Sequence, residues 1–468
     1  MSSEVRDSDP GATEARDPPT ESRPVRRSDA ESQSLAAILN LVRLGVATTR
    51  QALELETGLG RAVIADRLAT LTGHGLIEEA ELGQAAGGRP PRIVRFRASA
   101  GLILMAVIGQ SSLSVGVADL ASQSIAEHHE PSDAGLPPDK ALKRLRTLFD
   151  WLLEQHLRAG NVWGIGIAID GPVDSNDAAP TTSPQFPFLP SWSGFPFVEQ
   201  LAATYRSPVW LRSSVQMMTL GEAHQGDGDT VRDLLFVELG REITAGLISG
   251  GRLHRGFQGS AGLIGHIATS EDNTALCRCG NAGCLETVAG GDAVAREGLV
   301  AAQQGRSRLL AEMLERNGEL TAADVGSAAQ LGDPFSAELL ARCGRLIGTA
   351  LAAVVNAVNP SVVVLGGVLA QTSDIPLATI RETVYRRAHP LVTRDLRIIR
   401  SQLSSSAGLW GAALVVAEAL FAPGHVAGWI DYGAPSRHPD FSRALLRAEA
   451  TLQRKDARPK PPPAGAAG

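Results

Sequence analysis

Four side chains in the middle of the chain could together bind one metal ion: His266, Cys277, Cys279 and Cys284. Three thiolates and one imidazole are donors that Zn²⁺ prefers in closed, tetrahedral, structural sites. Gly280 and Gly283 allow the backbone to fold back, so that the last cysteine reaches the same ion as the first two. The sequence therefore predicts a structural zinc site. The alternative is that these are reduced, buried cysteines acting as small hydrophobic residues, which is what we expect of Cys343 on the apolar stripe of a predicted helix.

Basic side chains near the N-terminal end of the chain could contact DNA. Arg89 stands between Gly88 and Pro90, which fix an extended backbone, and an arginine so placed can enter a narrow minor groove. The full set of predicted DNA contacts is Thr49, Arg50, Arg61, Ala62, Arg67 and Arg89. The start of the predicted reading helix, residues 59–65 (LGRAVIA), has few side chains that can hydrogen-bond to base edges, so we expect specificity to depend on DNA shape. A winged helix that serves only protein contacts is the alternative.

Residues 33–98 contain the elements of a winged helix-turn-helix. Three short helical periods are separated by glycines. The apolar stripe of the first consists of Leu35, Ile38, Leu39 and Val42. Thr48 and Gln51 have the spacing of a capping box that opens the second helix, and the third helix starts near Gly60. Alternating residues at 92–97 predict a strand of a two-stranded ribbon, and three helices followed by a ribbon are typical of a winged helix.

From residue 99 onward, strands and helices alternate. The sequence predicts strands over 102–108, 113–118, 162–169, 234–239, 245–248 and 362–365, and helices over 142–157 and 335–358. This alternation indicates an α/β body of two lobes, about 99–220 and 221–421. The polar residues 1–32 and the Pro-rich and Ala-rich residues 422–468 are expected to be mostly disordered tails.

The composition is that of a globular protein, with 44% hydrophobic and 20% charged residues. A net charge of −6 excludes a protein that is basic throughout, but not a small DNA-binding unit on an acidic body. The first thirty residues are polar and lack the apolar core of a signal sequence, and apolar runs are interrupted before they reach membrane-spanning length. We therefore expect a cytoplasmic protein without a membrane partner.

The whole arrangement resembles the ROK family (repressors, open reading frames and sugar kinases), and in particular its transcriptional regulators with an N-terminal winged helix. Residues 277–286, CRCGNAGCLE, preceded by Gly265 and His266, are similar to the family's zinc signature. Residues 88–91, 171–174 and 365–367 also follow the family pattern. The resemblance implies an actin-like, ribonuclease H-like body with a sugar cleft between its lobes.

The residues that serve phosphoryl transfer in the family's kinases are largely replaced here. The acid of the first phosphate loop is Val107, and the second loop contains Glu242, which would repel a phosphate. Ser214 stands where the resemblance implies the catalytic aspartate, and a serine cannot deprotonate a sugar hydroxyl near neutral pH. No nearby carboxylate is expected to replace it, since Asp170 belongs to a different loop. The sequence predicts a protein without kinase activity; an alignment shifted by a few residues is the alternative.

The sugar contacts implied by the resemblance are altered as well. A glutamate of the family is Leu263 here, and two further polar contacts are lost at Ser213 and Ser214. His266 and Glu286 remain as the predicted effector-binding side chains, and Glu286 as a plain surface carboxylate is the alternative. We expect an altered effector, or none.

These features together predict a DNA-binding transcriptional regulator, in the first instance a repressor, that binds a double-stranded DNA operator as a homodimer or homotetramer. Its body would be a catalytically inactive module for oligomerisation and for sensing a sugar or sugar phosphate, or for dimerisation alone. The alternative from another class is a glucokinase-like sugar kinase with an appended DNA-binding domain.

Overall fold

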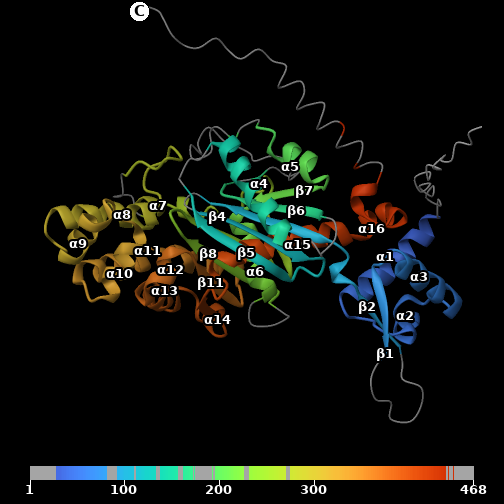
Figure 1. Ribbon diagram of the computed structural model, residues 1–468. Coiled ribbons are helices and arrows are strands. Elements are labelled where there is room, and N and C mark those ends of the chain that lie inside the picture. Colours follow the sequence, from blue (N-terminus) through green and yellow to red (C-terminus); the bar gives the residue numbers. More distant parts are fainter. Residues whose placement is uncertain are drawn as a thin grey trace, which may run out of the picture.

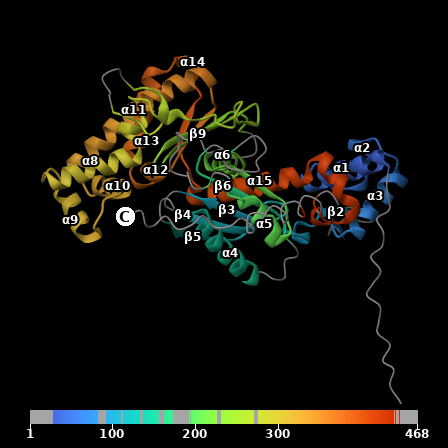
Figure 2. The same cartoon turned by 90° about the horizontal axis from the view of Figure 1, so that it is seen from above.

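The computed structural model has a small N-terminal unit at one end and two α/β lobes, of which the first lies between this unit and the second lobe (Figures 1 and 2). The structure describes residues 28–81, 92–109, 112–132, 137–155, 162–171, 173, 192, 195–225, 231–269, 275–438, 441 and 446. The predicted contact Arg89 and most of the two predicted tails lie outside these residues.

The N-terminal unit (residues 28–96) has three helices and a two-stranded sheet: α1 (Asp29–Arg43), α2 (Arg50–Thr57), α3 (Arg61–Gly73), β1 (Ile77–Glu81) and β2 (Arg92–Phe96). The two strands pair antiparallel, and the order of elements is that predicted for a winged helix-turn-helix. The first helix starts inside the predicted tail, because the Ser28 side chain caps it by accepting a hydrogen bond from the backbone N–H of Glu31.

The start of α2 corrects the predicted capping box. Thr49, not Thr48, is the N-cap, and its hydroxyl accepts a hydrogen bond from the backbone N–H of Ala52 at 3.2 Å. Gln51 is therefore the second residue of the helix, one position before the place from which a capping-box side chain reaches back. The helix ends at Gly58, whose φ of +68° lies in the left-handed region that glycine adopts without a steric penalty.

Each lobe is built on a five-stranded sheet, and the two sheets have the same topology. The first contains, in spatial order, β5 (Ser124–Pro131), β4 (Ser112–Asp119), β3 (Leu102–Ile108), β6 (Val162–Ile169) and β7 (Val209–Ser213). The second contains β10 (Arg252–His254), β9 (Ile243–Ser249), β8 (Leu234–Leu239), β11 (Val362–Gly366) and β12 (Arg397–Arg400). In both, three successive strands pair antiparallel, and two later strands add in parallel beside the first of them. This repeat confirms the predicted actin-like, ribonuclease H-like architecture.

Helices flank both sheets. Those of the first lobe are α4 (Pro138–Gln155) and α5 (Phe197–Tyr205). Those of the second are α7 (Glu286–Ala289), α8 (Gly291–Gln303), α9 (Arg308–Asn317), α10 (Ala322–Gln330), α11 (Pro334–Val358), α12 (Val368–Thr372), α13 (Asp374–Arg387) and α14 (Pro390–Thr393). Short 3₁₀ turns occur at η1 (Ala98–Ala100), η3 (Ile264–His266) and η4 (Ser404–Ser406).

Two central helices, α6 (Ser214–Gln225) and α15 (Ala407–Phe421), join the lobes. α6 leaves the first sheet and packs on β8 and β9 of the second, whereas α15 leaves the second lobe and packs on β3 and β6 of the first. The two helices also pack on each other so closely that a side chain at Gly221 would collide with the carbonyl of Ala407. The predicted boundary between residues 220 and 221 therefore falls inside an element shared by both lobes.

α15 is also the most apolar helix among the described residues. The stretch Ser404–Phe421 is long and apolar enough, by length and composition, to cross a membrane, but 67% of it is buried inside the fold. Its packing between the first sheet and α6 accounts for this composition, because a helix that is apolar on all sides is typical of a protein core.

The segment after α15 corrects the predicted C-terminal tail. It forms α16 (Pro423–Trp429), η5 (Ile430–Tyr432) and η6 (Pro435–Arg437), and α16 packs against α1 (Figures 1 and 2). Trp429 is only 4% exposed, and its ring centroid lies 5.3 Å from that of Trp163. One continuous apolar core thus runs from the N-terminal unit through this segment into the first lobe.

Candidate functional site

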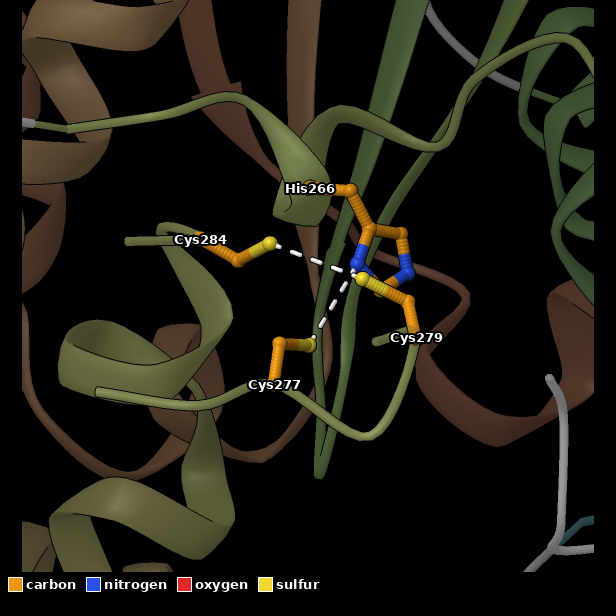
Figure 3. A group of neighbouring side chains, drawn as sticks. All are labelled: His266, Cys277, Cys279 and Cys284. Carbon is orange, nitrogen blue, oxygen red and sulfur yellow. Dashed lines mark hydrogen bonds between the residues drawn. The ribbon is translucent and has the colours of Figure 1, made fainter. Parts of the chain in front are cut away.

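The four predicted metal ligands come together in the second lobe (Figure 3). Their donor atoms all lie within 4.8 Å of one another. Cys279 Sγ is 3.7 Å from Cys284 Sγ, and Cys277 Sγ is 3.6 Å from His266 Nδ1. Bonds of about 2.3 Å to sulfur and 2.0–2.1 Å to nitrogen give a zinc tetrahedron edges of roughly 3.6–3.8 Å. The donor set and its spacing therefore fit one tetrahedral Zn²⁺ ion.

Two separate segments supply these ligands. His266 ends η3, whereas the cysteines lie on a turn that contains Gly280, with a φ of +94°. An isolated antiparallel bridge between Ala268 and Cys284 holds the segments side by side. Burial raises the pKa of the Cys284 thiol to about 12, so a bound cation is needed to keep this sulfur as a thiolate at neutral pH. A metal ion here would crosslink two stretches that have little regular structure.

A cavity of about 830 Å³ lies between the two lobes. The first lobe contributes the ends of β3, β6 and β7 and the start of α6, and the second contributes the β8–β9 turn and residues 259–263. Ser214 and Leu263, where the resemblance implies polar groups, both line this cavity. The cleft predicted between the lobes is therefore present, with altered side chains.

Neither predicted effector-binding residue lines that cavity. His266 faces the cysteine cluster, where its Nδ1 lies near Cys277 Sγ. Glu286 is 8% exposed and lies 3.1 Å from a guanidinium nitrogen of Arg278, which also lies 2.7 Å from Glu242 in the cavity wall. Glu286 is thus connected to the cavity through an ion-pair chain rather than directly, and it is not the plain surface carboxylate considered as the alternative.

Asp170 lies beside Ser214, which corrects the expectation that no carboxylate is near this position. β6 and β7 are parallel neighbours and end at the same edge of the sheet, so the residues that follow them meet. Ser214 Oγ donates a hydrogen bond to Asp170 Oδ1 at 2.5 Å. The position where the resemblance implies a catalytic aspartate thus has a carboxylate next to it, which accepts a hydrogen bond from Ser214.

Glu238 is a candidate residue that the sequence analysis missed. It stands near the end of β8, lines the cavity, and forms no side-chain hydrogen bond with the residues that the structure describes. Burial, and then the charges of Asp170 and Glu222, raise the pKa of Glu238 to about 7. The sequence feature that could have identified Glu238 is that it is the single acidic residue in the otherwise apolar strand LLFVEL.

Glu238→Gln is expected to stabilise the protein above neutral pH and to have little effect in acid. The folded-state pKa of about 7 lies above the ordinary 4.5, so the folded chain keeps a proton that the unfolded chain releases in this interval. The free energy of unfolding therefore falls as pH rises from about 4.5 to 7, by a total of roughly 3 kcal/mol. Urea unfolding at about pH 8 should show a gain for Glu238→Gln that is absent at about pH 4. Glu319→Gln, at an exposed cavity residue, is the control, and equal gains in both variants would contradict the assignment.

The N-terminal end of α3 is an exposed surface suited to DNA. The Arg61 side chain is 90% exposed, and Ala62 and Val63 beside it are also exposed. The N-cap, Gly60, offers no side-chain hydrogen bond to the first turn. Helix N–H groups without such a cap can bind a phosphate oxygen. The structure therefore places the predicted contacts Arg61 and Ala62 where a DNA strand can reach them.

Two other predicted contacts are engaged in interactions within the unit. The Thr49 hydroxyl is the cap of α2. Arg50 is half exposed, but its guanidinium lies 2.6 Å from Glu79 on β1, whose second oxygen lies 3.2 Å from Arg92. The hydrogen bond from Arg50 is the main cause that lowers the pKa of Glu79. Glu79, which the sequence analysis did not single out, thus offsets two arginines on the surface expected to face DNA.

The predicted DNA contact Arg67 is engaged between two helices of the N-terminal unit, and its contact with DNA stays a prediction. Its side chain is 14% exposed, and it binds α1 through Glu31 and Ser34 at 2.9 Å each. At ~100° per helical residue, a position six residues after Arg61 lies about 240° around the helix, on a different face. Arg67 therefore holds α3 against α1.

Residues 106–419 match the sequence pattern of the ROK family. The chain belongs to the ROK family. A glucokinase of Halalkalibacterium halodurans is 32% identical over 227 residues, which cover 48% of this chain and 69% of that enzyme. A putative xylose repressor of Caldicellulosiruptor sp. is 27% identical over 376 residues, which cover 79% of this chain and 91% of the repressor.

The crystal structure of a ROK family transcriptional regulator, a homolog of the E. coli MLC protein, has a similar fold, with a TM-score of 0.71. The identity is 24%, and the similarity covers 86% of this chain and 100% of that chain. This likeness concerns the fold. The cysteine cluster with His266, the cleft between the lobes and the N-terminal unit are the parts of this ROK protein that can do chemistry or bind a partner.

Proposed function

We propose that this ROK protein is a cytoplasmic, DNA-binding transcriptional repressor whose body senses a ligand and oligomerises but does not phosphorylate sugars. The observation that supports this most directly is the N-terminal unit itself, which shares a continuous core with the body while the start of α3 stays exposed. The similarity to the xylose repressor spans 376 residues, more than the ROK stretch at 106–419, and so extends into the flanking parts of the chain.

The glucokinase relative makes a sugar kinase the second candidate. Phosphoryl transfer needs a base on the accepting hydroxyl and donors for the phosphate oxygens. Here Ser214 occupies the position of the base and donates a hydrogen bond to Asp170, and a serine hydroxyl cannot accept a proton from a sugar near neutral pH. Glu242 lines the cavity where the second phosphate loop would receive a phosphate. These features favour the repressor.

The zinc and effector assignments complete the proposal. Zn²⁺ held by His266 and the three clustered cysteines would be structural, because the four donors leave no coordination position for a substrate. His266 and Glu286 would affect ligand binding indirectly, since neither lines the cavity. Glu286 would do so through Arg278, which also contacts Glu242 in the cavity wall. A two-fold homodimer, alone or paired into a tetramer, would present two recognition helices to an operator with two half-sites.

Arg61→Ala is expected to weaken binding to a palindromic operator by about 1–3 kcal/mol if Arg61 reaches a base, or to reduce the salt dependence by about one phosphate contact. The reason is that its guanidinium is exposed at the start of α3. Gel shifts across a salt series, with genomic fragments selected by the protein, measure both quantities.

Arg308→Ala is the matched control, because Arg308 is 91% exposed but lies on α9 of the second lobe. It should leave DNA binding unchanged. The repressor assignment is contradicted if the full chain binds no genomic fragment at low salt, or if both variants weaken binding equally.

A further inference from the structure

The cavity between the lobes is strongly acidic. Five carboxylates and one guanidinium belong to its described lining: Asp170, Glu238, Glu242, Asp292, Glu319 and Arg241. Arg241 is bound by Asp292, with nitrogen–oxygen distances of 2.9 and 3.2 Å. The Arg241 guanidinium is therefore already ion-paired with Asp292. A phosphate entering the cavity would meet an excess of negative charge.

Two carboxylates from opposite lobes, Asp170 and Glu238, contribute negative charge to the same cavity. Asp170 follows β6 of the first lobe and is oriented by Ser214 at 2.5 Å. Glu238 lies on β8 of the second lobe, close enough for the Asp170 charge to act on it. Glu238 is half-buried and lines the cavity, and no described residue donates a hydrogen bond to its side chain. A half-buried carboxylate that opens on a cavity and has no partner among the described residues can bind a cation or keep a proton.

Neutral hydrogen-bonding groups surround these carboxylates. Hydroxyl side chains line the same cavity: Ser112, Ser213, Ser214, Thr244 and Ser260. Hydroxyls both donate and accept, so they suit a ligand that carries several hydroxyl groups of its own. The cavity volume of about 830 Å³ falls in the range typical of small-molecule sites.

We propose that the cavity binds a hydroxyl-rich ligand with a protonated amine, of the amino-sugar class, and that its ammonium group is held between Asp170 and Glu238. This inference rests on the sensing role proposed above and specifies its ligand class. It also replaces the sugar phosphate considered from the sequence, since the carboxylates of the lining outnumber its guanidinium even though Asp292 and Glu242 are each ion-paired with an arginine, and the excess negative charge disfavours a phosphate ester. An ammonium can donate three hydrogen bonds, which matches carboxylates approaching from two lobes. Binding would therefore draw the lobes together.

Calorimetric titration of the full chain tests the ligand class with three probes of one ring skeleton: glucosamine, glucose and glucosamine 6-phosphate. At a pH where the amine is protonated, glucosamine should bind at least about tenfold more tightly than either of the other two, because only it supplies an unopposed positive charge. Equal or weaker binding of glucosamine overturns the proposal, as does the absence of binding by all three.

Substitutions at the two carboxylates test whether the ammonium group of the ligand lies between them. Glu238→Gln and Asp170→Asn should each weaken glucosamine binding by about tenfold or more, and should weaken glucose binding by a clearly smaller factor. Glu319→Gln is the matched control, because Glu319 lines the same cavity but is exposed, and it should change binding little. Thermal melts of each variant verify folding. If Glu319→Gln weakens binding as much as Glu238→Gln, or if Mg²⁺ alone binds with the same dependence on the variants while glucosamine does not, the amine assignment is wrong.

A DNA-binding measurement separates this inference from the proposed function. Glu238→Gln should bind the selected genomic fragments as tightly as the unmodified chain when no probe is present. Unmodified chain that binds DNA but shows no preference for glucosamine overturns the ligand class alone. Unmodified chain that fails to bind any DNA overturns the repressor function instead.

Discussion

Cys279→Ser is expected to remove the metal from the protein and to lower its free energy of unfolding by several kcal/mol. The cysteine turn is held to the rest of the lobe by isolated bridges, and His266 reaches it from a separate 3₁₀ turn. Without an ion, three thiols and an imidazole would lie within 4.8 Å of one another, and the turn would keep its backbone hydrogen bonds but lose the crosslink between the cysteines and His266. Structural zinc sites in peptides have apparent binding free energies of roughly 10–16 kcal/mol, most of which is folding free energy. Metal analysis should find about one zinc per unmodified chain and almost none in the variant.

Cys343→Ser is the matched control for this substitution. Cys343 is a buried core residue of α11, as the sequence predicted, and it lies outside the cluster, with Sγ 3.7 Å from the carbonyl oxygen of Val288. This variant should keep its zinc and lose only the modest stability that burying a hydroxyl costs. Unmodified protein without zinc, or a Cys279→Ser variant with unchanged metal content and thermal midpoint, would disprove the metal site.

The parts of the fold that depend on local sequence were predictable. The strands Val162–Ile169 and Leu234–Leu239 have the bounds predicted from the sequence, because each is an apolar run that ends at polar or glycine residues. The zinc cluster was predictable for a similar reason, since most of its ligands lie within one turn of chain. Spacing along the sequence is a reliable guide where the residues concerned are also near neighbours in space.

The acidic cleft could not be predicted in this way. Ser214 and Asp170 are 44 residues apart and meet only because β6 and β7 lie side by side in parallel. Glu238 faces them from the other lobe. The sequence comparison with kinases identified what was lost at Ser214, but the charge that took its place comes from elements whose pairing is a property of the whole fold.

The prediction of a C-terminal tail was wrong for another reason. The segment has few apolar residues, and this low proportion led to the prediction of a disordered tail. A single tryptophan, however, can bury 150–250 Å², which outweighs several smaller side chains. The Trp429 ring packs edge-on against the rings of Trp163 and Phe421. Its Nε1 donates a hydrogen bond to the carbonyl of Leu420 at 2.9 Å. Counting residues underestimates a segment that is held by one aromatic anchor.

Trp429 lies near α15, the helix that contacts both the cavity between the lobes and the N-terminal unit. One end of α15 packs at the cavity, where Gly408 lies against Val107. The other end, Phe421, accepts a hydrogen bond from Asn40 of α1 at 2.8 Å through its carbonyl and lies under the guanidinium of Arg43. A movement of α15 relative to the first sheet would therefore reach the N-terminal unit through contacts that α16 helps to hold in place.

Trp429→Ala is therefore expected to cost about 3–5 kcal/mol of stability, as for other buried tryptophans, and to loosen the N-terminal unit from the body. Trp429→Phe should restore most of the loss, because it keeps an aromatic ring and gives up one hydrogen bond. Trp151→Ala is the control, since Trp151 is 41% exposed on α4 and should cost far less. Urea unfolding measures the three values, and hydrogen exchange should show lost protection in α1 for Trp429→Ala alone.

The same variant separates anchoring from DNA contact. A loosened N-terminal unit still has its own recognition helix, so binding to a single half-site should change little. Binding to a palindrome needs two units held at a fixed separation, and it should weaken by about tenfold or more, because the effective concentration of the second unit falls. Arg61→Ala, by contrast, removes a contact and should weaken binding to both kinds of site. Equal losses on half-site and palindrome in Trp429→Ala, or stability no lower than in Trp151→Ala, would show that the C-terminal segment does not position the DNA-binding unit.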